Sequence, residues 1–302
     1  MTASPPAAPG RPASSPLPAL AAALGARDLH SPVSFGPLDE AWRPVSALWG
    51  EDRAGMARLL ESQRAYSPEL DAKGQSAYLI SAYAHALATP AAEAIAGFGL
   101  MPDIETERLG YRLEAYASRY LDRDIRLERL HLRVSGAHFA TDDPRWDGHP
   151  HALLLPDREA LADHARAALE RHMAPLILRL NAYSRLPVAA LWRLVGDALA
   201  YALLEAGRRL GREDQAVADA LAVLKQPGSP LANKEMRFVE IALVDGGTPG
   251  RELARQRFRA RGGCCRYYTV GGGELCGTCV LRKPKDLHDK LGELMRGELG
   301  EA

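Results

Sequence analysis

All four cysteines of this 302-residue chain fall within sixteen consecutive positions near the C-terminus. They are Cys264, Cys265, Cys276 and Cys279, and no cysteine precedes them. A disulfide-stapled secreted domain spreads its cysteines through the fold, so this clustering indicates a metal or redox site in a reducing compartment. Four thiolates are the usual ligand set of a structural zinc ion or of a [2Fe-2S] cluster.

The spacing of the cysteines helps to distinguish these two centres. A zinc site with four cysteine ligands usually has two knuckles, each with two to four residues between its cysteines. Only Cys276-Gly-Thr-Cys279 has that form here, whereas Cys264 and Cys265 are adjacent. Both reach one site only if the backbone turns, which the two preceding glycines favour. The pattern therefore favours [2Fe-2S], with zinc, a thiol redox pair or unliganded cysteines as alternatives.

Charged side chains are unevenly distributed along a chain whose formal net charge is zero. Residues 251–290 contain ten basic and four acidic residues, and the rest of the chain balances this positive segment. The zero total excludes a protein that coats nucleic acid or membrane over its whole surface. The basic segment would raise the reduction potential of an anionic cluster; a solvated face or a contact with anionic lipid is the alternative.

Composition divides the chain into three parts. Residues 1–38 are rich in proline and alanine and poor in charge, which predicts a disordered tail. Residues 39–244 are expected to form a mainly helical domain. Glycine pairs from about residue 245 mark the start of a C-terminal four-cysteine module over 245–302. The expected fold class is mainly α with a minor β component, an α+β fold.

Individual elements follow from hydrophobic spacing and from capping residues. Ser67 and Pro68 are typical of a helix start, as is Asp157, and Pro175 is expected to kink or split its helix. Helices are predicted over 69–88, 91–100, 105–121, 158–180, 188–210 and 213–224. Strands are expected over 127–134 and 152–155, and residues 238–244 are compatible with a strand or with a buried helix.

Two segments of the cysteine region carry a resemblance to a known family. Residues 264–268 read CCRYY and residues 271–279 read GGGELCGTC. Two adjacent cysteines, ten residues and then C-x-x-C, with an aromatic pair and a glycine at these places, resemble the C-terminal signature of the FhuF-like ferric-siderophore reductases. Residues 184–192 resemble that family's helical body more diffusely. Arg266 and residues 280–281 depart from the family's common residues, at positions that are not cysteines.

The resemblance implies a [2Fe-2S] cluster held by all four cysteines and reduction of Fe(III) in a siderophore, commonly a hydroxamate. Hydroxamate oxygens hold Fe(III) tightly and Fe(II) weakly, so one electron would release the iron without a general acid or a nucleophile. No catalytic residue beyond the cluster ligands is therefore expected. The expected substrate contacts are Arg266, Tyr268, Arg282 and Lys283.

The expected partners are a ferric siderophore and a protein electron donor, since no flavin or NAD(P)H fingerprint is present. Residues 17–26 lack the basic start and strong hydrophobicity of a signal peptide, and no apolar run approaches the length of a membrane span. A cytoplasmic protein is expected, with a peripheral contact at the inner membrane or a siderophore importer and no contact with nucleic acid.

Two functions of other classes stay open. One is a four-cysteine zinc module whose basic face contacts nucleic acid or protein. The other is a [2Fe-2S] electron carrier that serves a partner enzyme and has no siderophore substrate. Histidines and aspartates between residues 131 and 151 could also bind a metal, although Asp143-Pro144 and Asp147-Gly148 are turn signals and favour a polar loop.

Overall fold

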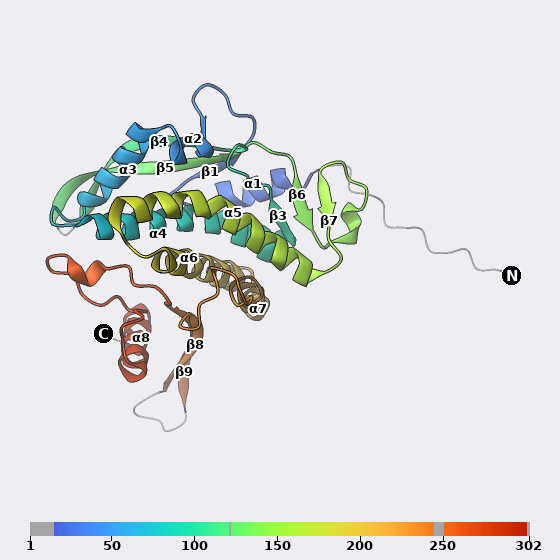
Figure 1. The fold of residues 1–302 in the computed structure, drawn as a ribbon. Helices are drawn as coiled ribbons and strands as arrows, with labels where there is room; N and C mark the ends of the chain where they lie inside the picture. Colours follow the sequence, from blue (N-terminus) through green and yellow to red (C-terminus); the bar gives the residue numbers. More distant parts are fainter. Residues whose placement is uncertain (1–14, 121, 245–250, 301–302) are drawn as a thin grey trace.

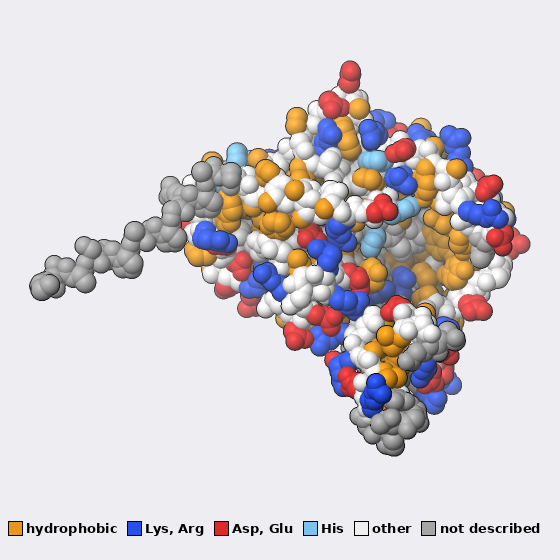
Figure 2. Space-filling view, turned by 180° about the vertical axis from the view of Figure 1, so that it is seen from behind, with side chains coloured by type: hydrophobic (Ala, Val, Ile, Leu, Met, Phe, Trp, Pro, Cys, Tyr) orange, Lys and Arg blue, Asp and Glu red, His pale blue; other side chains and the backbone are white. Residues whose placement is uncertain are grey.

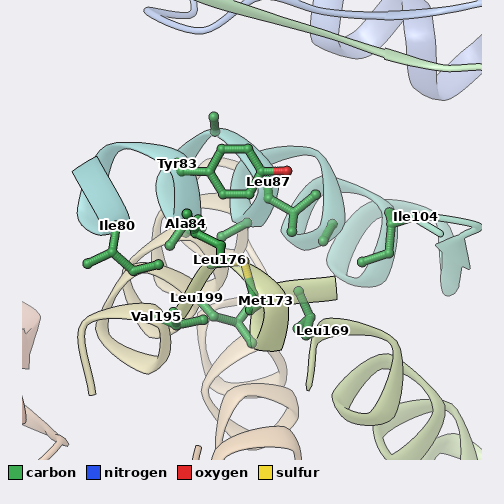
Figure 3. Close-up of a cluster of buried hydrophobic side chains, with 14 of the residues drawn as sticks. Ile80, Tyr83, Ala84, Leu87, Ile104, Leu169, Met173, Leu176, Val195 and Leu199 are labelled. Atoms are coloured by element: carbon green, nitrogen blue, oxygen red, sulfur yellow. The ribbon is translucent and has the colours of Figure 1, made fainter. Parts of the chain in front are cut away.

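Three long helices form the centre of the computed structural model, which describes residues 15–120, 122–244 and 251–300. They are α4 (Ala72–Glu93), α5 (Arg158–Ser184) and α6 (Val188–Arg209), with α7 (Glu213–Leu224) packed against α5 and α6 (Figure 1). Figure 3 shows apolar side chains from α4, α5 and α6 pointing into one shared core. Burial of these side chains away from water is the main term that holds the helices together.

One histidine is buried within this helical core. His172 on α5 is 2% exposed, and its Nδ1 donates a 2.7 Å hydrogen bond to the carbonyl oxygen of Ile104. Its Nε2 therefore accepts the 2.6 Å hydrogen bond from the hydroxyl of Tyr83 on α4. Burial lowers the pKa of His172 to about 4, so both partners bind the neutral imidazole at neutral pH.

A four-stranded sheet, in the order β1-β5-β4-β2, lies over the helices. Its largest part is an antiparallel hairpin of β4 (Leu109–Tyr120) and β5 (Arg123–Val134). β1 runs parallel to β5, and β2 runs antiparallel to β4. The remaining elements at this side are β1 (Val33–Phe35), β2 (Arg43–Pro44), α2 (Val45–Trp49) and α3 (Arg53–Arg64).

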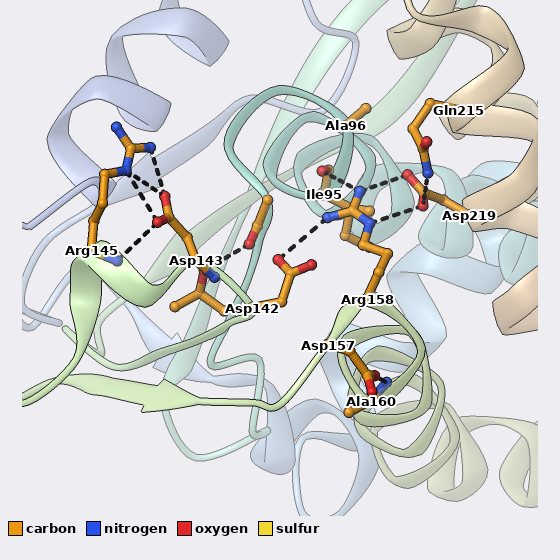
Figure 4. Close-up of polar contacts among 12 residues, drawn as sticks. Ile95, Ala96, Asp142, Asp143, Arg145, Asp157, Arg158, Ala160, Gln215 and Asp219 are labelled. Carbon is orange, nitrogen blue, oxygen red and sulfur yellow. Dashed lines mark hydrogen bonds and ion pairs between the residues drawn. The ribbon is translucent and has the colours of Figure 1, made fainter.

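A second, smaller sheet lies at the C-terminal end of α4, and the π-helical turn η1 (Ala94–Phe98) leads into it. Arg158, at the start of α5, forms hydrogen bonds with both η1 and α7 (Figure 4). Its Nη2 lies 2.6 Å from Oδ2 of the buried Asp219 and 2.9 Å from the carbonyl oxygen of Ile95. The sheet consists of β3 (Leu100–Pro102), β6 (Phe139–Thr141) and β7 (Ala152–Leu154), with η2 (Pro144–Trp146) beside β7.

The C-terminal module has a small core of its own. β8 (Arg237–Val244) and β9 (Glu252–Ala260) form an antiparallel hairpin, and α8 (Pro284–Glu298) packs against it. Because β8 pairs with β9, we propose that the module begins with β8, at Arg237, whereas composition indicated a start at residue 245. Its core side chains are Ile241, Leu243, Ala260, Leu287, Leu291 and Met295.

The predicted disordered tail needs correction where the structure describes it. Residues 1–14 lie outside the described residues, but Leu17–Gly25 forms the helix α1. Leu20 and Leu24 are buried on it and pack with Phe139. The helical spacing of these leucines supplies enough apolar surface to order the segment, although the surrounding composition is rich in proline.

Residues 105–121 were expected to be a helix, and the structure shows the strand β4 instead. Its apolar residues fit helical spacing, but alternate positions from Leu109 through Tyr111 to Leu113 also fit a strand. Tyr111 pairs with Leu132, and Leu113 with Leu130, across the hairpin. These cross-strand apolar pairs decide between two patterns that the sequence alone allows.

Neither Pro90 nor Pro175 ends its helix. Pro90 and Pro175 lie inside continuous helices, so α4 has no separate successor at residue 91 and α5 is not split. Asp71, rather than Ser67, caps α4 by accepting a 2.7 Å hydrogen bond from the Gly74 N–H. The expected helices over 188–210 and 213–224 and the α+β fold class are confirmed. Within the described residues, no helix is both long and apolar enough to cross a membrane.

Candidate metal centre

The four cysteines lie on the loop that connects β9 to α8, beside the N-terminal end of α4 (Figure 1). All four are free thiols; Cys279 is buried and the other three are partly buried. Cys264 interacts electrostatically with Cys265 and Cys279, and Cys276 interacts with the same two residues. Among the described residues, no three histidine, cysteine, aspartate or glutamate side chains form a group that could hold a metal ion.

The turn before the first cysteine pair is held by a buried carboxylate from the helical body. Asp197 on α6 is 1% exposed and accepts hydrogen bonds from the N–H groups of Gly262 (2.7 Å) and Gly263 (2.9 Å). A Cβ atom on Gly263 would lie 3.1 Å from the backbone carbonyl carbon of Arg193. The glycine therefore lets the loop approach α6 closely enough for Asp197 to bind it.

Two arginines balance the charge of Asp197. Nε of Arg261 lies 3.4 Å from Oδ2 of Asp197, and Nη1 of Arg259 lies 3.9 Å from the same oxygen. Burial lowers the pKa of Arg259 to about 10, and both guanidinium groups also interact with Cys276. The side of the loop that faces α6 thus carries two cations for one carboxylate, which favours a further negative charge at the cysteines.

The second cysteine pair is held by backbone contacts. The N–H of Cys279 donates a 3.1 Å hydrogen bond to the carbonyl oxygen of Cys276, which closes the knuckle. Arg282 donates to the carbonyl oxygens of Leu275 (2.5 Å) and Cys276 (2.9 Å). The N–H of Arg261 donates to the carbonyl oxygen of residue 278 at 3.0 Å, so the two cysteine pairs are tied together.

The pKa values of two of the thiols are shifted in opposite directions. The pKa of Cys265 is lowered to about 5, because it accepts a hydrogen bond from the Cys276 thiol and lies near the Arg261 guanidinium. The same hydrogen bond and burial raise the pKa of Cys276. Thiolate is the form in which cysteine binds metals.

Buried polar atoms without a hydrogen-bond partner in the described structure surround this loop. A buried donor that lacks a partner costs roughly 1–3 kcal/mol, so several together indicate a missing acceptor. An anionic centre with sulfur acceptors fits both the cysteines and these donors. The atoms are Oη of Tyr78, Nδ2 of Asn233 and the Nε atoms of Arg259 and Arg266.

The four residues predicted to contact substrate fall into two groups. Arg266 and Arg282 bind protein groups: Nη2 of Arg266 lies 3.2 Å from Oδ2 of Asp71, and Arg282 binds carbonyl oxygens of the loop. Tyr268, 45% exposed on the short helix η3 (Tyr267–Thr269), and the exposed Lys283 lie at the surface. A role in substrate binding stays a prediction for all four.

The histidines between residues 131 and 151 lie in two places. His131 contacts Glu114 across the β4–β5 hairpin at 2.6 Å. The rings of His138 and His149 each meet the ring of His151 edge to face near β7, and His138 and His151 line a cavity of about 330 Å³. This small sheet lies at the other end of α4 from the cysteine loop (Figure 1).

A group of tyrosines beside the cysteines was missed by sequence reasoning. The rings of Tyr66 and Tyr120 meet edge to face with centroids 5.2 Å apart, and the Tyr66 and Tyr78 centroids are 6.1 Å apart. Oη of Tyr120 donates to Oη of Tyr267 at 3.4 Å, and Tyr78 interacts electrostatically with Cys265. These residues are far apart in the chain, so only the tertiary fold could reveal the group.

The basic residues of segment 251–290 are largely paired with acidic side chains. Arg257 lies 2.7 Å from Asp214, and Lys285 lies 2.6 Å from Asp289. Figure 2 shows positive and negative side chains interspersed on the face opposite to that of Figure 1, including the projecting hairpin. The excess charge counted along the sequence therefore does not form one uniform basic surface on this face.

Two family models match the chain. A model described as ferric iron reductase FhuF-like transporter matches residues 77–242, which is more than half of the chain. A model described as FhuF 2Fe-2S C-terminal domain matches residues 261–281, which contain all four cysteines. The cofactor of the C-terminal module is accordingly a [2Fe-2S] cluster. No curated protein matches the chain.

Proposed function

Because the chain belongs to the FhuF-like ferric iron reductase family, we propose that it transfers one electron to Fe(III) held in a siderophore. The substrate we propose is a hydroxamate complex, and the place of reaction is the cytoplasm. Fe(III) gains one electron and becomes Fe(II), which hydroxamate oxygens hold weakly. The electron comes from another protein, since the chain has no flavin or NAD(P)H fingerprint.

We propose Cys264, Cys265, Cys276 and Cys279 as the cluster ligands. A bound [2Fe-2S] cluster supplies single electrons at a potential set by its net charge and hydrogen bonds. The residues around it hold the loop in place and balance charge: Asp197 binds the turn before the first cysteine pair, and the arginines beside it offset negative charge at the thiolates.

The observation that carries this proposal is the combination of four free thiols on one loop with buried donors that lack partners in the described structure. Tyr78 Oη and Arg259 Nε belong to side chains that interact with Cys265 and Cys276, respectively. Thiolates and bridging sulfides are acceptors for such donors. The same loop carries Tyr268, which is 45% exposed, so a ferric complex could approach a cluster held by this loop from solvent.

The test is to mix anaerobically purified, dithionite-reduced protein with a ferric hydroxamate and an Fe(II) chelator. We expect the visible spectrum of the oxidised cluster to return as the Fe(II)–chelator colour develops, with one Fe(II) formed per cluster oxidised. Protein that contains zinc and no labile sulfide would contradict the cofactor. Protein that keeps its reduced cluster in the presence of the ferric complex would be an electron carrier instead.

A further inference from the structure

We propose that the cleft between the tip of the β4–β5 hairpin, the α3–α4 connection and the cysteine loop binds the ferric complex; this inference rests on the proposed function. The cleft has a volume of about 320 Å³. Its walls include Tyr66, Glu69, Tyr120 and Arg123 from the body and Val270 and Gly271 from the cysteine loop.

The cleft lies against the cysteine loop on the side of the tyrosines. Val270 and Gly271 follow η3, whose Tyr267 hydroxyl accepts a 3.4 Å hydrogen bond from Tyr120. Tyr78, which interacts with Cys265, meets Tyr66 at a ring distance of 6.1 Å. A ligand in the cleft would therefore contact the loop that holds the thiols, and electron transfer requires such proximity because its rate falls steeply with distance.

The lining suits an uncharged complex with an apolar periphery. The rings of Tyr66 and Tyr120 offer flat apolar surface, and the guanidinium of Arg123 is held at the rim by a 2.9 Å hydrogen bond to the carbonyl oxygen of Tyr66. Arg123 contributes a positive charge to the lining of the cleft, and Glu69 contributes a negative charge. Three hydroxamates neutralise a ferric ion, whereas three catecholates leave a highly charged anion that Glu69 would repel.

The cavity near β7 is a poorer candidate for this substrate. It adjoins β3, beyond the C-terminal end of α4, while the cysteine loop contacts Asp71 at the N-terminal cap of the same helix. A helix of 22 residues is about 33 Å long, so a ligand in that cavity is remote from the thiols. The cleft beside Tyr120, by contrast, is lined in part by the cysteine loop itself.

The test uses the cluster-loaded full-length protein and two ligands. The Ga(III) complex of a trihydroxamate, which cannot be reduced, measures binding by calorimetry, and the Fe(III) complex measures reoxidation of the reduced cluster. Tyr120→Leu and Arg123→Ala each weaken Ga(III)-complex binding by about fivefold to tenfold. Gly271→Leu, which adds a side chain toward Glu69, blocks the cleft. The matched controls are Tyr183→Leu and Arg145→Ala, outside the cleft.

Reoxidation by ferricyanide, which needs no specific site, and the visible spectrum show whether each variant keeps an intact cluster. Slower reoxidation by the Fe(III) complex, with ferricyanide unaffected, supports the cleft. Variants that bind and react like the wild type overturn the cleft but leave the proposed function standing. A wild-type protein that neither binds the Ga(III) complex nor reduces the Fe(III) complex overturns both.

Discussion

The carboxylate of Asp197 accepts a 2.9 Å hydrogen bond from the N–H of Gly263, the residue directly before the first cysteine of the candidate centre. This contact joins α6 of the helical body to the cysteine loop. The same carboxylate binds a second backbone N–H and faces two largely buried arginines. One side chain therefore satisfies several groups that are largely shielded from water, and its removal leaves all of them without this partner.

Asp197→Ala is expected to reduce the free energy of unfolding by about 3–5 kcal/mol, because it leaves buried cations and N–H groups uncompensated. The cluster content per chain should fall with it. Chemical denaturation and iron and sulfide analysis measure the two effects. The control is Asp214→Ala, since Asp214 is 93% exposed and its ion pair with Arg257 contributes little. Equal behaviour of the two variants would contradict the role assigned to Asp197.

Cys276→Ser is expected to remove the visible absorption of the [2Fe-2S] cluster or to change it strongly, because a serine oxygen is a poorer iron ligand than a thiolate. Thr278→Ala is the matched control in the same turn, where the backbone carbonyl oxygen makes the contact with Arg261. Absorption spectra of anaerobically purified protein make the comparison. A normal spectrum for Cys276→Ser would show that Cys276 is not a ligand.

Arg282→Ala should lower cluster occupancy, since the guanidinium holds the carbonyl oxygens of Leu275 and Cys276. Arg282→Lys should rescue it only in part, because an ammonium group lacks the fork of donors. Lys283→Ala should leave occupancy unchanged, since this side chain is exposed. Iron analysis after anaerobic purification separates the three. Full occupancy in Arg282→Ala would show that the contacts of Arg282 with these carbonyl oxygens are not needed to hold the cluster.

The sequence predicted the cysteines of the centre and the turn before them, but few of the residues elsewhere in the chain that contact this loop. The cysteine spacing and the glycines before Cys264 involve residues that are close together in the chain, so a sequence motif can reveal them. Asp197 is more than sixty residues away from the turn that it binds and looks like an ordinary polar residue on an amphipathic helix. Tyr66 and Tyr120 likewise meet Tyr267 only through the tertiary fold.

Secondary structure shows the same division between local and long-range information. The helix over 213–224 was predicted at both ends because its apolar spacing and its terminators are local. Leu109 to Tyr120 fitted both a helix and a strand, and cross-strand partners on β5 made it a strand. Pro90 remains within α4 because side chains on both sides of it are buried in the core, which outweighs its poor helix propensity.

Titration of His172 makes the free energy of unfolding depend on pH. Its pKa is lowered to about 4 in the folded chain by burial, against an ordinary value of 6.5. Below pH 6.5 the unfolded chain binds a proton that the folded chain does not, so this residue makes stability fall as the pH decreases. The loss develops between about pH 6.5 and pH 4 and amounts to about 3 kcal/mol in total.

His172→Gln keeps a side chain that can hydrogen bond but removes this titration. The variant should be less stable than the wild type at pH 7.5, because glutamine fits the site between Tyr83 and Ile104 less well. Its stability should nevertheless fall less steeply toward pH 5. Urea unfolding at both pH values measures the difference in slope, from which the other histidines cancel because both proteins contain them. Parallel pH profiles would show that His172 titrates normally in the folded chain.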